Sequence, residues 1–129
     1  MTDRQQIRIL LIEDSRTQVA LVRTNLVEVF DVPFILESAE RLADGLEHLS
    51  ESPFDVLLLD LNVLDSAGFD TFLAAKAATD VPIVIMSGEE DAAQAMRAVS
   101  EGAHDYLVKG EYTPESFARC LRRVVQGTT

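Results

Sequence analysis

The stretch FDVLLLD, residues 54–60, decides the fold, because it is a short apolar run that ends on an acid. Runs this short and largely aliphatic are typical of strands buried on both faces of a parallel sheet. Three other runs also stop on polar residues: Ile7–Ile12 before Glu13 and Asp14, Pro82–Met86 before Ser87, and Tyr106–Val108 before Lys109. The carboxyl ends of parallel strands meet at one edge of a sheet, so the sequence predicts that these polar residues gather there.

A weaker fifth run, Phe34–Leu36, lies between Ile7–Ile12 and FDVLLLD. The segments between the runs carry apolar residues at helical spacing: Val19, Val22, Leu26 and Val29; Leu42, Leu46 and Leu49; Phe69, Phe72 and Leu73; Ala92, Ala95, Met96 and Val99; and Phe117, Leu121 and Val124. Five strand-then-helix units predict an α/β fold, a doubly wound five-stranded parallel sheet in the order 2-1-3-4-5 flanked by five helices. Ligands of such a sheet bind outside the carboxyl ends of its first and third strands.

Residue types at the helix boundaries support this reading. Ser15 followed by Gln18 has the form of a capping box, and Thr113, Pro114 and Glu115 place a cap, a first-turn proline and a first-turn acid in the favoured order. Gly45 weakens the second helix of the pattern.

The composition indicates one compact domain over residues 1–129, since nearly half of the residues are apolar and the length suits a single core. Twenty-two Asp and Glu against eleven Lys and Arg leave a net charge of −11, which repels nucleic acid and anionic membranes. We find no signal-peptide pattern and no apolar run near the roughly 20 residues of a membrane span, so we expect a cytoplasmic protein. The single Cys120 suggests neither a disulfide nor zinc, and we expect it on the core side of the last helix.

Three carboxylates should meet at the edge of the predicted sheet. Neighbouring strands lie about 4.8 Å apart, which brings Glu13 and Asp14 close to Asp60. Like charges at that range raise one another's pKa unless a cation lies among them, and oxygen ligands without His or Cys favour Mg²⁺ or Mn²⁺. The alternative is that Asp14 only caps the first helix while Glu13 is solvated.

The polar residues at the ends of the other predicted strands complete a set suited to phosphoryl transfer. Asp60 is the predicted nucleophile, because a carboxylate mounted on a rigid strand can form an aspartyl phosphate, although it could also be a simple turn residue. Ser87 places a hydroxyl one strand further along, unless it only caps the helix that starts near Asp91. Lys109 lies two strand spacings from Asp60, roughly 10 Å, so only its long side chain could reach back, and a solvated lysine is the alternative. An acceptor carboxylate, metal-binding acids, a hydroxyl and an ammonium together predict phosphoryl transfer.

At these stretches the sequence resembles the receiver domains of two-component response regulators, the CheY-like family, which have a flavodoxin-like fold. The resemblance covers essentially the whole chain, through Leu10–Asp14, Val56–Asp65 with Gly68, Pro82–Gly88 and Glu101–Lys109. It implies that a histidine kinase, a phosphotransfer protein or a small phosphodonor passes a phosphoryl group to Asp60. Such a domain is a signalling switch that catalyses its own phosphorylation and dephosphorylation at most, so we do not expect an enzyme.

The resemblance also implies how the metal is held. Glu13, Asp14 and Asp60, with the backbone carbonyl of Asn62, would hold Mg²⁺ directly or through water. In the family, the positions of Asn62 and Glu89 tune how water reaches the acyl phosphate.

The resemblance further implies a switch. Ser87 and Lys109 would contact the phosphoryl oxygens, and Tyr106 would change rotamer as the hydroxyl is drawn in. The surface of the fourth helix, last strand and last helix would then be biased towards binding a downstream protein partner or an output domain, or towards forming a homodimer. Receivers occur both alone and fused ahead of output domains, and either organisation fits.

Three positions depart from the family pattern. Gly110 replaces the proline that usually follows the lysine, often after a cis bond. A cis Lys-Gly bond would cost about 2.5–4 kcal/mol, which disfavours it, but the sequence leaves open both the cis or trans state of this bond and the angle of the lysine. Leu64 stands where many members have proline, which loosens the loop after Asp60. Ser87 replaces the commoner threonine and keeps the hydroxyl.

Other readings fit less well. A flavodoxin-like electron carrier needs a Ser/Thr/Gly-rich phosphate loop after the first strand, where this chain has Glu13-Asp14-Ser15-Arg16. A calcium loop starting at Asp60 fails because Leu64 and Asp65 occupy positions that need a ligand and a glycine. A hydrolase lacks the G-x-S-x-G motif, and we expect His48 and His104 to be solvated. An interaction module that keeps the receiver fold without phosphorylation remains an alternative.

Arg119, Arg122 and Arg123 form a basic stripe on the last predicted helix of an acidic protein. A solvated helix face is the simpler interpretation. The stripe also lies on the surface that receivers use to dimerise or dock, so binding to a partner of the active state is a second hypothesis for it.

Overall fold

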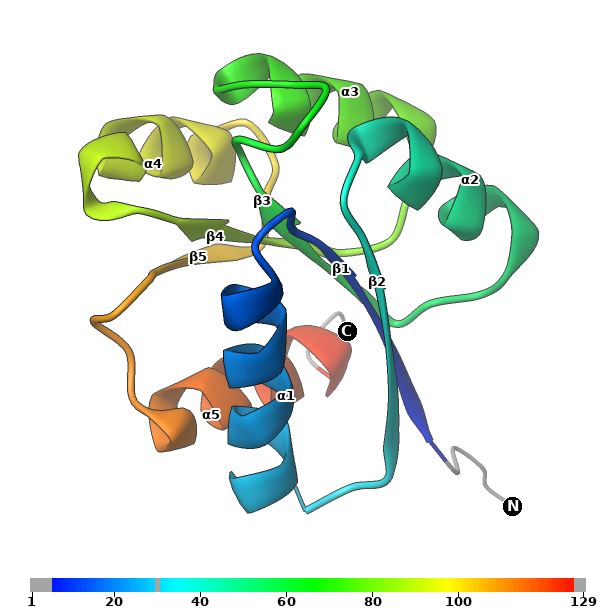
Figure 1. Ribbon diagram of the computed structural model, residues 1–129, viewed down its shortest axis with the longest axis vertical. Coiled ribbons are helices and arrows are strands. Elements are labelled where there is room, and N and C mark those ends of the chain that lie inside the picture. Colours follow the sequence, from blue (N-terminus) through cyan, green and yellow to red (C-terminus); the bar gives the residue numbers. More distant parts are fainter. Residues whose placement is uncertain (1–5, 30, 127–129) are drawn as a thin grey trace.

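The computed structural model describes residues 6–29 and 31–126, in which strands and helices alternate (Figure 1). The strands are β1 (Ile7–Ile12), β2 (Phe34–Ala39), β3 (Val56–Asp60), β4 (Ile83–Ser87) and β5 (Asp105–Val108). The helices are α1 (Arg16–Val29), α2 (Leu42–Glu51), α3 (Phe69–Ala78), α4 (Ala92–Ser100) and α5 (Pro114–Gln126), and a 3₁₀ turn, η1 (Glu89–Asp91), leads into α4. All neighbouring strands pair in parallel in the order β2-β1-β3-β4-β5, which confirms the predicted fold.

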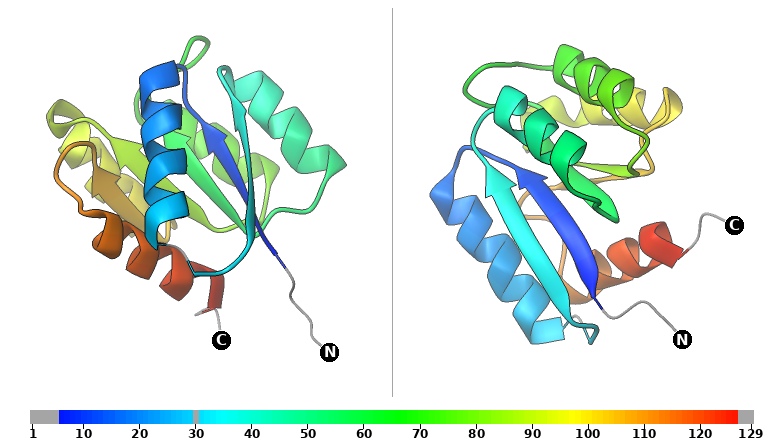
Figure 2. Two further views of the ribbon diagram at one scale, coloured as in Figure 1. Left: turned by 60° about the horizontal axis from the view of Figure 1, so that its bottom comes forward. Right: turned by 90° about the vertical axis from the view of Figure 1, so that its right-hand side faces the viewer.

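The sheet is covered on both faces, and each face has its own core. Helices α1 and α5 lie on one side, and α2, α3 and α4 on the other (Figure 2). Successive residues of β1 point to opposite sides, so that Ile9 and Leu11 pack towards α1 and α5 while Leu10 and Ile12 pack towards the other helices. Two-sided burial explains why the strands read as continuous apolar runs.

The last helix contributes the buried Cys120, as predicted. Burial, and after it the carboxylate of Asp105, raises the pKa of its thiol to about 12. The thiol is therefore protonated at neutral pH.

No helix among the described residues is long and apolar enough to cross a membrane.

Both predicted caps are present. The Ser15 hydroxyl accepts a hydrogen bond from the Gln18 backbone N–H at 3.3 Å, so the cap of α1 is Ser15. The Ser15 backbone N–H donates to the Glu13 carboxylate, where a capping box would have used the Gln18 side chain. At α5, the Thr113 hydroxyl accepts from the Ser116 N–H at 3.0 Å, and the Ser116 hydroxyl accepts from the Thr113 N–H in return.

Helix α2 is capped by a residue from a distant loop. The Asp65 carboxylate, in the connection between β3 and α3, accepts hydrogen bonds from the backbone N–H groups of Leu42 at 2.6 Å and Ala43 at 3.1 Å. These bonds, first from Ala43 and then from Leu42, hold the pKa of Asp65 below its usual value. A carboxylate at a helix N-terminus also complements the helix dipole. The loop after β3 is thereby fixed to α2.

Gly45 permits a close approach of α2 to β1. A Cβ at position 45 would lie 2.2 Å from Cδ1 and 2.5 Å from Cγ1 of Ile12, whose side chain is fully buried. The glycine that weakens the helix by propensity is therefore needed for packing.

We expect Gly45→Ala to destabilise the protein by about 1–2 kcal/mol, because overpacking outweighs the gain in helix propensity. The measurement is urea denaturation at neutral pH. Ile12→Ala removes both Cδ1 and Cγ1, so Gly45→Ala should cost clearly less in that background. Equal costs in both backgrounds would contradict the close approach.

Candidate functional site

The strand register places Glu13 beside Asp60. In the pairing of β1 with β3, Ile12 is opposite Leu59, so the next residue of each chain segment is one of the two acids. Both side chains are buried, since Glu13 is 2% and Asp60 6% exposed. Two acids enclosed this deeply need a compensating charge.

Lys109 provides that charge. Its Nζ lies 2.8 Å from Oε1 of Glu13 and 2.9 Å from Oδ2 of Asp60. The strand end positions it, because the Lys109 backbone N–H donates to the carbonyl of Ser87 and so continues the β4–β5 pairing past Val108. The long side chain does reach across two strand spacings, and the solvated lysine is excluded.

Burial and the neighbouring charges have opposing effects on the pKa values of Glu13 and Lys109. Burial raises the pKa of Glu13 to about 7; the bond to Lys109 pulls it down, and the neighbouring Asp60 pushes it up. For Lys109, burial lowers the pKa, but the two carboxylates outweigh burial and raise it above its usual value. The lysine is therefore charged at neutral pH, while Glu13 titrates near it.

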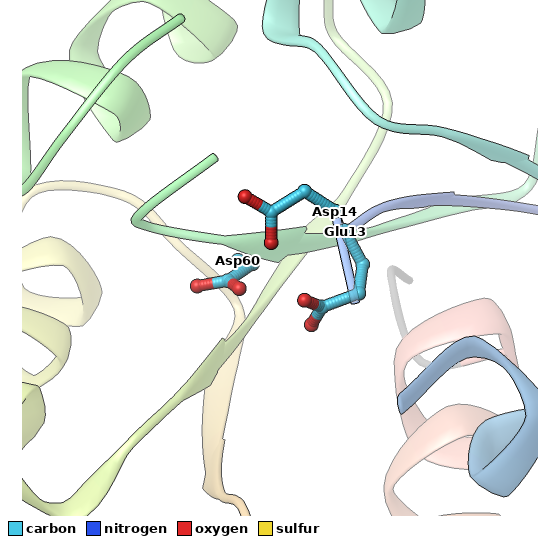
Figure 3. A group of neighbouring side chains, drawn as sticks. All are labelled: Glu13, Asp14 and Asp60. Carbon is cyan, nitrogen blue, oxygen red and sulfur yellow. The ribbon is translucent and has the colours of Figure 1, made fainter. Parts of the chain in front are cut away.

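Asp14 joins the two buried acids at the mouth of the site. One carboxylate oxygen each from Glu13, Asp14 and Asp60 lie within 4.8 Å of one another (Figure 3). Figure 3 shows the three carboxylates, carried by the ends of β1 and β3, around one common space. An all-oxygen donor set of this spacing fits a hard divalent cation such as Mg²⁺.

Ser87 ends β4 on the face that α4 covers. It lies at every second position of the strand with Ile83 and Ile85, so it faces the same side, and these two residues pack in the same core as Ala95 of α4. Its hydroxyl is buried and has no hydrogen-bond partner, so it does not cap the following helix, and that alternative was wrong. Tyr106 of β5 packs in the same core, since its register partner is Ile85.

Asn62 is attached to Asp60 through its backbone. Its N–H donates to Oδ1 of Asp60 at 3.0 Å, which holds the carboxylate oxygen that Lys109 does not contact. The buried Thr71 hydroxyl donates to the carbonyl of Leu61 at 2.7 Å and holds the same turn from α3. Leu64, further along the loop, is exposed.

The contacts of two residues near the site were not predicted from the sequence. Asp91 accepts a hydrogen bond from the Asn62 side chain, and Asp65 caps α2. Each contact joins segments more than 20 residues apart, and neither acid belongs to a local motif. Only a family alignment could have carried a signal for them.

The sequence leaves open whether the bond after the lysine is cis or trans. No described peptide bond is cis, so the bond between Lys109 and Gly110 is trans, and Gly110 has φ +83°. The lysine reaches both acids from this turn.

The basic stripe on α5 is largely neutralised within the chain. Arg122 pairs with Asp31 at 3.4 Å, and Arg123 pairs with Asp105 of β5. Arg119 is exposed. The stripe is thus part of a mixed-charge surface, and its role in binding is still a hypothesis.

A five-stranded doubly wound sheet with an acidic group at its carboxyl edge defines an α/β domain of the flavodoxin-like class with a candidate cation site. Residues 9–120 match the family model of the response regulator receiver domain. The chain belongs to this family, whose members act in two-component signalling.

Relatives and solved structures agree with this assignment. The chain is 33% identical over 100 residues to the regulatory protein LuxO of Vibrio cholerae, covering 77% of this chain and 21% of LuxO. It is 30% identical over 122 residues to the transcriptional regulatory protein KdpE of Mycobacterium tuberculosis, covering 94% of this chain and 52% of KdpE. The chain thus spans between a fifth and about half of these relatives' length.

Among solved structures, a response regulator receiver domain protein from Clostridium thermocellum superposes with a TM-score of 0.78 at 24% identity, over 92% of this chain and 94% of that one. A receiver domain of a sensor histidine kinase from Pseudomonas aeruginosa gives 0.76 at 19% identity, over 93% and 98%. That structure carries a magnesium ion in its active site cleft. At these identities the likeness shows the fold.

We expect Lys109→Met to raise the pKa of Glu13 above its value of about 7, by about one unit or more, because the ammonium that favours the carboxylate is gone. The measurement is a pH titration of the Glu13 carboxyl carbon by NMR without metal. Lys76→Met, which removes the chain's other lysine on α3, is the matched control and should leave that pKa unchanged. An unchanged Glu13 pKa in Lys109→Met would contradict the ion pair.

Proposed function

We propose that this chain is a phosphoacceptor switch of a two-component system, in which Asp60 accepts a phosphoryl group from a histidine kinase, a phosphotransfer protein or a small phosphodonor. The observation that carries the proposal is the surroundings of Asp60. A charged lysine lies on one side at 2.9 Å, and a buried, unpartnered hydroxyl ends the neighbouring strand. An isolated structural acid would need no such hydroxyl.

In the transfer step, a carboxylate oxygen of Asp60 attacks phosphorus. The new P–O bond forms as the bond to the donor breaks, and the donor leaves with the electron pair. Lys109 is placed to stabilise the phosphoryl oxygens as a point charge, and Ser87 supplies a hydroxyl donor to another oxygen. Both residues are mounted on strand ends, which fixes the positions of their backbones relative to Asp60.

The donor set at the mouth fits Mg²⁺, with Mn²⁺ as a possible substitute. Glu13, Asp14 and Asp60 would hold the ion with the backbone carbonyl of Asn62, directly or through water. When bound, the ion neutralises charge on the transferring group and the acids. The chain would then catalyse its own phosphorylation and dephosphorylation at most.

The switch is proposed to run along one face of the sheet. Ser87 and Tyr106 both lie on the side covered by α4, so drawing the hydroxyl towards a phosphoryl group changes the packing around Tyr106. The surface of α4, β5 and α5 would be biased towards a downstream partner, an output domain or a second copy of the chain. The relatives, of which this chain covers only a part, include transcriptional regulators.

We expect a single phosphoryl adduct after incubation with acetyl phosphate and Mg²⁺, measured as intact-protein mass. Asp60→Asn should give no adduct, because the nucleophile is lost. Asp70→Asn, which changes an exposed acid in the first turn of α3, is the matched control and should be modified like the wild type.

An adduct that survives in Asp60→Asn would place the acceptor elsewhere. No adduct from acetyl phosphate or from histidine kinases, with the fold intact, would contradict the proposal and favour the phosphorylation-independent interaction module.

We expect Mg²⁺ to raise the melting temperature of the wild type by about 3–10 °C at saturation, because it binds the folded acid cluster. Asp14→Asn should abolish most of this shift without lowering the metal-free melting temperature, since it removes one of three like charges. Differential scanning calorimetry with and without a chelator measures both values. Glu101→Gln, which changes an exposed acid after α4, is the control and should keep the full shift. A full shift in Asp14→Asn would exclude Asp14 as a ligand.

A further inference from the structure

The Asn62 side chain is held at both of its polar atoms. Its Oδ1 accepts a hydrogen bond from the Gly68 backbone N–H at 3.0 Å, and its Nδ2 donates to Oδ2 of Asp91 at 2.7 Å. The Gly68 N–H can only donate, and Oδ2 of Asp91 accepts, so both neighbours require the same orientation of the amide. The carboxamide is thereby occupied by Gly68 and Asp91, while only the Asn62 backbone N–H is bonded to Asp60.

Asp91 belongs to a row of residues that packs on the start of α3. Asp91, Gln94 and Arg97 are spaced three apart and so lie along one side of η1 and α4. Gln94 lies so close to Gly68 that a Cβ there would be 2.8 Å from its Oε1. The Arg97 guanidinium carbon lies 3.9 Å from the centre of the Phe69 ring. The hydrogen bond that Asp91 makes to Asn62 therefore comes from a segment that packs against the start of α3.

Gly68 is suited to its part in this arrangement. It has φ +69°, in the left-handed region that favours glycine, and its N–H donates to Asn62. The three residues Asn62, Gly68 and Asp91 thus form a chain of two hydrogen bonds across the loops on either side of the site.

We propose that Asp91 is a positioning residue that restrains the Asn62 carboxamide and so lengthens the lifetime of the phosphoryl group on Asp60. The inference rests on the proposed function of Asp60. It adds a control of dephosphorylation by a residue of the loop before α4, acting through Asn62.

The chemistry of phosphoryl loss gives the direction of the effect. Water attacks phosphorus, the P–O bond to Asp60 breaks, the carboxylate leaves with the electron pair, and the attacking water loses a proton to solvent. A carboxamide two residues from Asp60 that is free to rotate can hydrogen-bond that water and orient it. While its Nδ2 is held by Asp91, the carboxamide is not free to do this.

The experiment measures loss of the phosphoryl group over time by intact-protein mass, after acetyl phosphate is removed from the phosphorylated full chain with Mg²⁺ present. We expect Asp91→Ala to speed the loss about three- to tenfold, the range set by one hydrogen bond. Asp91→Asn keeps an acceptor oxygen and should restore much of the lifetime. Glu90→Ala removes the same charge from an exposed neighbour and should leave the lifetime unchanged.

A double-mutant cycle separates positioning from charge. Asp91→Ala should have no effect in an Asn62→Ala background, because the proposed action runs through the Asn62 amide. Hydrogen exchange of the Gly68 amide in the unphosphorylated protein is the second readout. It should be faster in Asp91→Ala, because Asn62 is then held less firmly.

Equal lifetimes for wild type and Asp91→Ala would overturn the inference. So would an equal acceleration in the Asn62→Ala background, since Asp91 would then act by its charge alone. A wild type that takes no phosphoryl group would overturn the proposed function instead. That outcome is distinguishable, because exchange at Gly68 still shows whether Asp91 holds Asn62.

Discussion

The ammonium group of Lys109 makes the acidic edge of this sheet possible. Glu13 and Asp60 are almost fully enclosed, and a buried carboxylate without a partner costs several kcal/mol. One Nζ within 3 Å of both oxygens compensates them together, and the lysine can do so only because the β4–β5 pairing continues to its own backbone N–H. The sheet order is thus a requirement of the charge arrangement. Had β5 been placed elsewhere, the acids would face each other uncompensated.

The loop between β3 and α3 is the second constraint, because it carries the residues directly after Asp60. It is tied to α2 by Asp65, to α3 by Thr71, and to the loop before α4 by Asn62. The Thr71 bond is buried, whereas the bond from Asn62 to Asp91 is exposed to water. Exposed hydrogen bonds contribute less and open more easily. The side towards α4 is therefore the side on which this loop is most readily released.

Much of the fold could be predicted from the sequence, because most strands are short apolar runs that end at a polar residue. The run Ile7–Ile12 is a strand over its whole length, and the helical spacings fall within observed helices. The differences lie at boundaries: β2 continues to Ala39, beyond the predicted Leu36, because β1 offers six consecutive partners. Register also placed Glu13 beside Asp60, as the strand ends implied. By contrast, Asp65 and Asp91 make contacts that only tertiary packing creates, and neither lies in a local pattern that would mark it.

The division of the core between the two faces gives the proposed switch a direction. Ser87 and Tyr106 share a face with α4, whereas Met86 packs with α1 and α5. A hydroxyl that is buried without a partner has an unmet hydrogen bond, and a phosphoryl group on Asp60 would meet it. Movement of Ser87 therefore affects the α4 side first, while the other core keeps the sheet fixed. The exposed contact of Asp91 lies on that same side, so the loop that would move with Ser87 also carries the proposed control of phosphoryl lifetime.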